Sequence, residues 1–184
     1  MTDIKTTENE FRGLVIHWLS ELFERGSYPF EHVTSDPSIK VEEGKSRYPD
    51  VQIWFNRKAE QGFCGWELKT TATPADDPEL LENAAEKARA MKADHFVTWN
   101  MRDAIIWRTP NFDEKVTSQY RQRTYLPISQ INIPDDLWVE SKKILLKERA
   151  KEILDDLVTQ HRDGHLHQVD VDTTFFVKLL HEAV

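Results

Sequence analysis

Two short motifs contain side chains that could hold a metal ion and hydrolyse a phosphodiester bond. The first is Tyr48-Pro49-Asp50, and the second is Glu67-Leu68-Lys69, with sixteen residues between Asp50 and Glu67. A divalent cation helps this hydrolysis by steadying charge on the phosphate and lowering the pKa of a bound water. Mg²⁺ prefers oxygen ligands, typically one or two carboxylates with waters and phosphate oxygens. Asp50 and Glu67 can supply those carboxylates, and the backbone carbonyl of Leu68 could complete the metal shell.

Lys69 follows Glu67 by two residues, so both side chains lie on one face if this stretch is a strand. An ammonium group there can position the attacking water and offset developing negative charge. It can also keep the carboxylates ionised, because a nearby cation lowers their pKa. A Glu-x-Lys pattern also occurs on solvated strand edges. Here Trp66 and Leu68 flank Glu67, and such neighbours are typical of a buried strand.

The residues around the two motifs predict neighbouring strands. At 49–56, one face carries Val51, Ile53 and Phe55, and the other carries Asp50, Gln52 and Trp54. At 63–70, one face carries Cys64, Trp66 and Leu68, and the other carries Phe63, Gly65, Glu67 and Lys69. The polar, turn-like stretch 56–61 lies between them, which predicts a β-hairpin. Asp50 and Glu67 would then project from adjacent strands, opposite the apolar faces.

Further elements on either side predict the rest of the architecture. A helix at 7–25 is indicated by an apolar stripe formed by Phe11, Leu14, Val15, Trp18, Leu19, Leu22 and Phe23. A second helix begins after Asp77, which can cap it, with Pro78 in its first turn. Strands are predicted at 28–34, 95–99 and 104–107. This order predicts an α/β fold, in which a mixed central β-sheet is flanked by helices.

The composition changes after residue 110. Residues 111–133 are polar and irregular, a long helix is predicted from 134 to about 161, and a last helix begins near 172. We therefore expect a core at 1–110, a linker or irregular segment at 111–133, and a helical extension at 134–184. The extension could be the start of a connector to further domains, although a short natural chain ending in a helix would look the same.

The order of helix, Pro-Asp strand, Glu-x-Lys strand, helix and strand resembles the PD-(D/E)xK nuclease superfamily over about residues 8–108. The resemblance implies a restriction-endonuclease-like core with αβββαβ order. It implies that Asp50 and Glu67 bind Mg²⁺, for which Mn²⁺ would substitute, and that Lys69 orients the water. Many members also use an acidic residue on the first helix, for which we choose Glu10 ahead of Glu8 and Glu21.

The resemblance implies a metal-dependent DNA endonuclease, the cleavage domain of a restriction-modification or phage-defence enzyme. The expected partners are DNA, methyltransferase and target-recognition domains in the same longer chain or complex, and a second copy forming a dimer on DNA. An alternative is a catalytically inactive nuclease-fold module that binds DNA or a partner subunit. A third interpretation is a helical interaction domain in which the C-terminal helices are the functional part.

The composition favours a soluble, cytoplasmic protein. Apolar runs are too short to cross a bilayer, and the N-terminus has no signal-peptide stretch. The single cysteine, Cys64, excludes an intrachain disulfide framework. The net charge of −8 differs from that of proteins that coat phosphates, but a nuclease needs carboxylates for its metal. We expect DNA binding by this chain to be weak and salt-sensitive.

Several other side chains allow more than one interpretation. Trp18, Trp66 and Trp138 fall on apolar stripes and are predicted in the core, whereas Trp54 shares a face with Asp50 and could line a cleft. Cys64 is predicted on a buried face. Hydroxyls in the stretch 70–73 could contact phosphate, although an ordinary loop fits equally well. The sequence favours solvent-exposed histidines over a zinc site at His161, His165 and His167.

Overall fold

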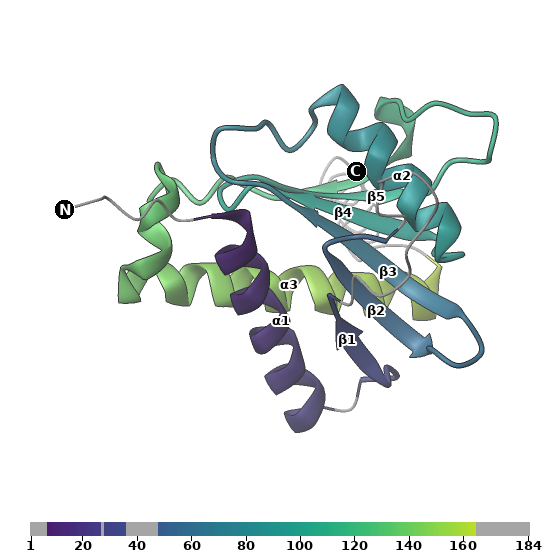
Figure 1. Ribbon diagram of the computed structural model, residues 1–184, viewed down its shortest axis with the longest axis horizontal. Helices are drawn as coiled ribbons and strands as arrows, with labels where there is room; N and C mark the ends of the chain where they lie inside the picture. The colour runs from purple at the N-terminus through teal and green to yellow at the C-terminus, as the bar shows by residue number, and fades with distance from the viewer. Residues whose placement is uncertain (1–6, 27, 36–47, 165–184) are drawn as a thin grey trace, which may run out of the picture.

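The chain forms a mixed β-sheet between helices (Figure 1), in a computed structural model that describes residues 7–26, 28–35 and 48–164. The helices are α1 (Glu8–Arg25), α2 (Pro78–Ala90) and α3 (Glu140–Asp163), with short 3-10 turns at Ser118–Tyr120 (η1) and Pro134–Trp138 (η2). The strands are β1 (His32–Thr34), β2 (Val51–Asn56), β3 (Gln61–Leu68), β4 (His95–Trp99), β5 (Ala104–Arg108) and β6 (Arg121–Thr124). The predicted α/β class is confirmed.

The six strands follow one another across the sheet in the order β1-β2-β3-β4-β5-β6. All neighbouring strands are antiparallel except β3 and β4, which are parallel and connected through α2. The predicted hairpin of β2 and β3 is therefore confirmed. The parallel pair matters most for a site, because the carboxyl ends of β3 and β4 meet at one edge of the sheet, where open α/β sheets commonly bind ligands.

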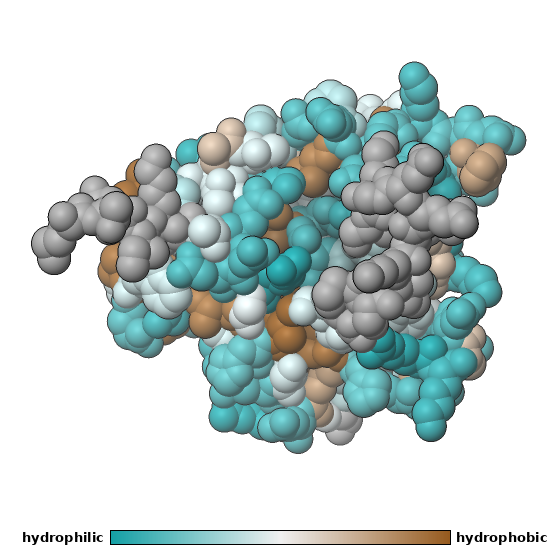
Figure 2. All heavy atoms as spheres, in the orientation of Figure 1, coloured by the Kyte–Doolittle hydropathy of each residue, from teal (hydrophilic) through white to brown (hydrophobic). Residues whose placement is uncertain are grey.

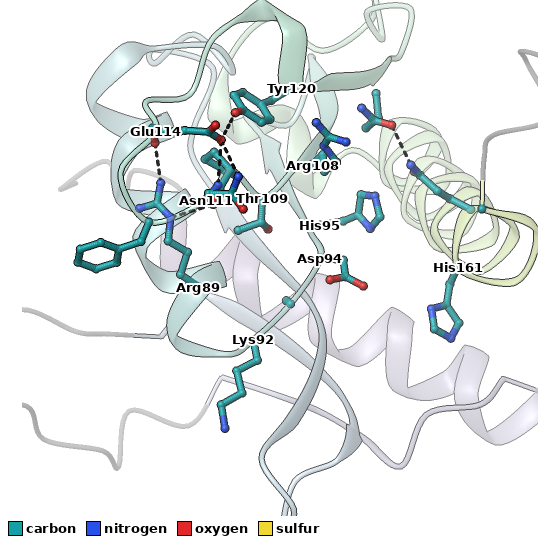
Figure 3. A pocket seen from close by; sticks show the side chains of 16 residues that line it. Arg89, Lys92, Asp94, His95, Arg108, Thr109, Asn111, Glu114, Tyr120 and His161 are labelled. Carbon is teal, nitrogen blue, oxygen red and sulfur yellow. Dashed lines mark hydrogen bonds between the residues drawn. The ribbon is translucent and has the colours of Figure 1, made fainter.

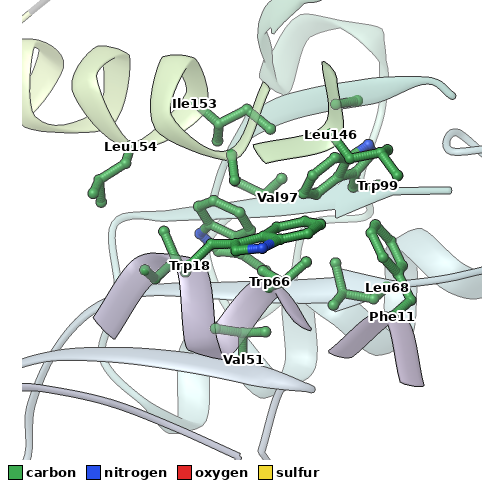
Figure 4. Close-up of a cluster of buried hydrophobic side chains, with 14 of the residues drawn as sticks. Phe11, Trp18, Val51, Trp66, Leu68, Val97, Trp99, Leu146, Ile153 and Leu154 are labelled. Atoms are coloured by element: carbon green, nitrogen blue, oxygen red, sulfur yellow. The ribbon is translucent and has the colours of Figure 1, made fainter. Parts of the chain in front are cut away.

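Helices cover both faces of the sheet. Figure 4 shows one face, where Trp66 and Trp99 of the sheet pack against Phe11 and Trp18 of α1 and against Ile153 of α3. On the other face, α2 presents small side chains, and this lets the helix approach the sheet closely. The alanines are Ala84, Ala85 and Ala88, and they pack with Phe96, Ile105 and Trp107. Trp18 and Trp66 are buried, as predicted.

The first two helices begin as the sequence predicts. The side chain of Thr7 caps α1 by accepting a hydrogen bond from the backbone N–H of Glu10. Asp77 caps α2 by accepting a hydrogen bond from the N–H of Leu80 at 3.0 Å, with Pro78 at the first helical position. The cap sets where α2 begins. This position matters because α2 supplies a residue to the candidate site described below.

The segment expected to be irregular contains a sixth strand. β6 lies at the edge of the sheet and pairs antiparallel with β5. Its residues Arg-Gln-Arg-Thr do not alternate between apolar and polar, which is why periodicity did not indicate a strand. Its arginines stack on rings instead: Arg121 lies 5.0 Å from the Trp107 ring centroid and Arg123 lies 5.1 Å from that of Tyr125.

Two predictions about buried aromatic residues were wrong. Trp138 is 52% exposed, because residues 134–138 form the 3-10 turn η2 and α3 begins only at Glu140, so Trp138 is outside the helical stripe. Phe63, predicted on the face of Glu67, packs with Phe30 and Phe55 on the other face. The β2–β3 register shifts between Ile53 and Trp54, and such a bulge turns one side chain to the opposite face.

Helix α3 packs on the same core as α1. Five of its residues are fully or almost fully buried there: Leu146, Ala150, Ile153, Leu154 and Leu157. Polar contacts add to this packing, since Tyr28 donates a hydrogen bond to Asp155 at 2.7 Å and Lys147 pairs with Glu21 of α1. The helix predicted from near 172 lies outside the described residues.

Figure 2 shows hydrophilic side chains over most of the viewed face, with small hydrophobic areas between them. Across the described ranges, no helix combines the length and apolar character that crossing a membrane requires.

Candidate active site

The two motifs meet where β2 begins beside the end of β3. Val51 pairs with Trp66 across the two strands, so Asp50 lies just before the hairpin contact. Asp50 Oδ2 accepts a hydrogen bond from the backbone N–H of Leu68 at 2.9 Å. Leu68 directly follows Glu67 in β3, and this bond therefore fixes the Asp50 carboxylate beside the Glu67 position. The predicted proximity of Asp50 and Glu67 is what the structure shows.

Glu67 is a buried carboxylate on the α2 face of the sheet, with only 3% of its surface exposed. Lys87 of α2 donates to both of its oxygens, at 2.8 Å to Oε1 and 2.9 Å to Oε2. Burial, and then the negative charge of Asp50, raise the pKa of Glu67 to about 7, although Lys87 opposes this rise. The Glu67 carboxylate is therefore harder to ionise than an exposed glutamate, and Lys87 is the cation that favours its charged form.

Lys69 is partly exposed at the carboxyl end of β3. Its Nζ lies 2.9 Å from Glu8 Oε2 at the start of α1. Burial lowers the pKa of Lys69, but the hydrogen bond and the charge of Glu8 outweigh that effect, with smaller contributions from Asp50 and Glu67, so the pKa is raised. Lys69 is thus a protonated ammonium in the field of several carboxylates.

Of the three candidate glutamates on helix α1, Glu8 is the one that contacts Lys69. Glu10, our choice from the sequence, instead accepts hydrogen bonds from Thr7 N at 2.7 Å and Thr7 Oγ1 at 3.1 Å. It closes the capping box of α1, because a glutamate at the third helical position can reach back to the cap residue. Glu21 pairs with Lys147 of α3.

Two cations in the site were missed by sequence reasoning. Lys87 could have been recognised from the sequence. It lies at helical spacing between Ala84 and Met91 on the apolar stripe of α2, where a solvent-exposed charge is unusual. Arg12 lies one turn after Glu8 on α1, and its Nη1 is 3.6 Å from Asp50 Oδ1. Glu8 and Arg12 are four residues apart, which is also the ordinary spacing of an exposed ion pair along a helix. The sequence therefore did not identify Arg12 as a site residue.

These contacts give a site in which positive and negative charges balance. The ion pairs Lys69–Glu8, Lys87–Glu67 and Arg12–Asp50 link three cations with three carboxylates. The formal sum is three minus three, or zero, with Lys69, Lys87 and Arg12 ionised and all three carboxylates deprotonated. The site therefore carries no excess negative charge of its own, unlike a cluster of carboxylates without cations.

The donor set fits a hard divalent cation that keeps several waters. Asp50 Oδ1 is 3.6 Å from Arg12, beyond hydrogen-bonding distance, so it retains lone pairs for a metal ion. Each oxygen of Glu67 has a second lone pair beside the one that faces Lys87. Within 7–26, 28–35 and 48–164, no group of three or more acidic, histidine or cysteine side chains could hold a metal. Two carboxylates are sufficient for Mg²⁺ if water and phosphate complete its shell.

A hollow of about 360 Å³ opens at the same edge of the sheet, between the loop after β3 and the β4–β5 turn. Asn100 shapes it by donating to Thr73 O at 2.8 Å and accepting from Asp103 N at 2.7 Å. Its lining includes Thr71 of the predicted phosphate-contacting stretch, together with Arg102 and Arg121, which pair with the lining carboxylates of Asp103 and Asp76. This hollow supplies hydroxyl and guanidinium groups close to the end of β3.

Trp54 does not line an open cleft. It is 4% exposed and packs with Met91 and Ala93, which follow directly after α2. Cys64 is fully buried, as predicted, and burial raises the pKa of its thiol.

A larger cavity, of about 810 Å³, lies at the opposite end of β4 and β5 (Figure 3). It is lined by His95 and Arg108, the first residue of β4 and the last of β5, and by charges of both signs, including Asp94. Burial lowers the pKa of His95 to about 4. The solvent-exposed His161 also lines it and stacks on Phe55 with centroids 4.8 Å apart. His165 and His167 lie outside the described residues.

Comparison of this chain with models of protein families, with curated proteins and with solved structures finds no match. A functional conclusion must therefore come from the chemistry of the site itself.

Proposed function

We propose that this chain is a magnesium-dependent endonuclease that hydrolyses DNA phosphodiester bonds. The observation that carries the proposal is the hydrogen bond from the N–H of Leu68 to Asp50 Oδ2. It joins the Pro-Asp motif to the Glu-x-Lys motif and sets two carboxylates and Lys69 at one strand end. Carboxylates and an ammonium in this arrangement match the requirements of metal-assisted phosphodiester hydrolysis.

Each side chain can be given a role in the proposed reaction. Asp50 and Glu67 would hold the metal ion, with the carbonyl of Leu68 as a further candidate ligand. A bound ion would supply charge stabilisation and a water of lowered pKa. Lys69, with its raised pKa, would remain protonated and offset negative charge that develops on the phosphate. Arg12, whose Nη1 lies 3.6 Å from Asp50 Oδ1, would contact a phosphate oxygen.

The hollow beside the site is compatible with a nucleic-acid substrate: Thr71 and the exposed Arg102 could contact a DNA backbone that follows this edge, although Arg102 and Arg121 are paired with Asp103 and Asp76 in the absence of DNA. The net charge of −8 predicts that the chain alone binds DNA weakly. We therefore also propose that target-recognition and methyltransferase domains, in the same longer chain or in a complex, supply affinity and sequence choice. Cutting both strands would take two copies on the DNA, because each copy offers one such site.

Cleavage of supercoiled plasmid at low salt tests the proposal. The purified chain would be incubated with Mg²⁺ or Mn²⁺, and then with EDTA, beside the variants Asp50→Ala and Lys69→Ala. Lys58→Ala is the matched control, because Lys58 is exposed in the turn between β2 and β3. We expect nicking that requires the metal, persists in Lys58→Ala and disappears in both site variants. Nicking that persists in Asp50→Ala would contradict the proposal.

A second candidate is a nuclease-fold module that binds DNA or a partner subunit without cutting. The observation that favours it is the complete pairing of the site's charges, above all the double hydrogen bond from Lys87 to Glu67. This candidate predicts DNA binding that is equal in wild type and Asp50→Ala, with no cleavage by either. Fluorescence anisotropy with a labelled duplex, run beside the plasmid assay, separates the two functions.

A further inference from the structure

Lys87 occupies a position that a metal ion could otherwise take. Its Nζ is nearly equidistant from the two oxygens of Glu67, at 2.8 and 2.9 Å. A cation equidistant from both oxygens of a carboxylate lies where a bidentate metal ion would bind. We propose that the site binds one divalent cation, on the Asp50 side of Glu67, and that Lys87 permanently occupies the place of a second. This inference rests on the proposed nuclease function.

The structure holds the Lys87 ammonium firmly in this place. Lys87 lies in the interior of α2, between the buried Ala84 and Ala88, and only 9% of its surface is exposed. Its side chain therefore reaches Glu67 between the helix and the sheet. Moving the ammonium away would leave a buried carboxylate without its cation, and breaking such a pair is strongly unfavourable. Lys87 should consequently remain in place when a metal ion binds.

The charge balance of the site also favours a single divalent cation. Without metal, three carboxylates balance three cations, as the ion pairs of Asp50, Glu67 and Glu8 show. One divalent ion brings the sum to +2, which the charge of a phosphodiester reduces to +1. Two ions would bring it to +4 before substrate binds, and the like charges would repel at short range in a partly buried site.

The donor set is also small. Two-metal sites hold their ions about 4 Å apart and share ligands between them. Among the residues that the structure describes, no cluster of three or more acidic, histidine or cysteine side chains is found. Asp50 and the Asp50 side of Glu67 are therefore enough for one ion and its waters. A second ion would need the oxygen lone pairs that now accept from Lys87.

Counting bound Mn²⁺ tests this inference without relying on activity. The full chain would be titrated with Mn²⁺ alone, with free Mn²⁺ followed by electron paramagnetic resonance. We expect one ion per chain for the wild type and for Lys87→Arg, which keeps the cation. Lys87→Glu replaces the cation by a carboxylate and should bind two. Asp50→Asn should weaken binding at least tenfold, which would place the single ion at the candidate site.

The outcomes separate the two proposals. Two ions in the wild-type chain would overturn the role of Lys87 and leave the nuclease proposal standing. No ion in the wild type would overturn both. One ion in Lys87→Glu would also overturn the role of Lys87, provided that circular dichroism shows the variant folded. If that variant does not fold, the counts for the wild type and Lys87→Arg decide the question.

Discussion

The ring of Pro49 packs directly over Gly65 of β3. A Cβ atom at position 65 would lie 2.3 Å from Pro49 Cγ and 3.0 Å from Pro49 Cβ, closer than side-chain atoms can approach. Glycine at this position thus allows the Pro-Asp motif to lie against the strand that carries Glu67. The distance between the two carboxylates depends on a residue that has no functional group.

Gly65→Ala should therefore damage both stability and the proposed activity. Overpacking against Pro49 should cost about 1–3 kcal/mol of the free energy of unfolding, measured in urea. Displacement of Asp50 should lower cleavage per folded molecule as well. Gly13→Ala is the matched control, because nothing lies within 4 Å of a Cβ there and Gly13 is in α1. That change should stabilise the chain by about 0.5–1 kcal/mol. Equal stabilities of the two variants would contradict this account.

Lys87→Met tests how much the buried ion pair contributes. The variant keeps a long side chain but leaves Glu67 buried without its cation, which should lower the free energy of unfolding by about 3–5 kcal/mol. Adding Glu67→Gln removes the uncompensated charge, so the double variant should recover most of the loss. Urea unfolding in EDTA at pH 8 measures both. A single variant as stable as the wild type would show that the pair is not formed in solution.

The raised pKa of Glu67 predicts how stability depends on pH. Burial and the charge of Asp50 raise it from 4.5 to about 7 in the folded chain. Between these values the unfolded chain binds fewer protons than the folded chain, so the contribution of Glu67 to stability falls as pH rises and levels off above 7. Glu67→Gln cannot ionise and should lack this fall. Unfolding curves in EDTA from pH 4.5 to 8 would measure it, and parallel curves for both proteins would refute the raised pKa.

Glu8 and Glu10 should have different effects although they are only two residues apart. Glu10→Ala removes the N3 half of the capping box and should cost about 0.3–1.5 kcal/mol of stability, with cleavage per folded molecule unchanged. Glu8→Ala leaves Lys69 without its closest carboxylate, so cleavage should fall about tenfold to a hundredfold through mispositioning. Plasmid nicking and thermal unfolding of both variants give the comparison. The reverse pattern would assign the site role to Glu10.

Arg102 should contribute to DNA affinity through phosphate contact. It is exposed beside the hollow at the carboxyl ends of β3 and β4, where its nearest carboxylate is that of Asp103. In Arg102→Ala, the slope of log affinity against log salt should become shallower by about 1. Lys58→Ala, on the β2–β3 turn, should keep the wild-type slope. An unchanged slope for Arg102→Ala would place the DNA elsewhere.

The hydrophobic pattern was sufficient to predict most of the elements around the site. Helices α1 and α2 have helical apolar spacing, β2 and β3 alternate, and β4 and β5 are short apolar runs, so the existence and order of these elements could be predicted. Strand β6 could not, because its stability comes from pairing with β5 and from arginine stacking on Trp107. The burial of Trp54 likewise depends on Met91 and Ala93, which pack over it after the end of α2 and which periodicity within β2 does not reveal.

The site was predicted only in part because its partners come from distant parts of the chain. The strand motifs predicted that Asp50, Glu67 and Lys69 lie near one another, and the β2–β3 hairpin does bring them together: Asp50 lies just before β2, Glu67 in β3 and Lys69 just after β3. The contacts of Lys87 and Glu8 depend on how α2 and α1 pack against the sheet. The position of Glu10, one turn before Leu14 at the edge of the apolar stripe, favours it over Glu8 in the sequence, but a glutamate of the capping box occupies the same place, and here Glu10 has that role.

The long helix α3 sets a condition on how the protein can be shortened or synthesised. Its 24 residues span about 36 Å, and its buried side chains reach as far as Leu157. Until that residue has left the ribosome, the sheet face with Trp66 and Trp99 has only α1 to cover it. A fragment that ends before α3 would keep both the Pro-Asp and the Glu-x-Lys motifs and still expose a wide apolar surface. Expression boundaries for this protein should therefore be placed beyond Leu157.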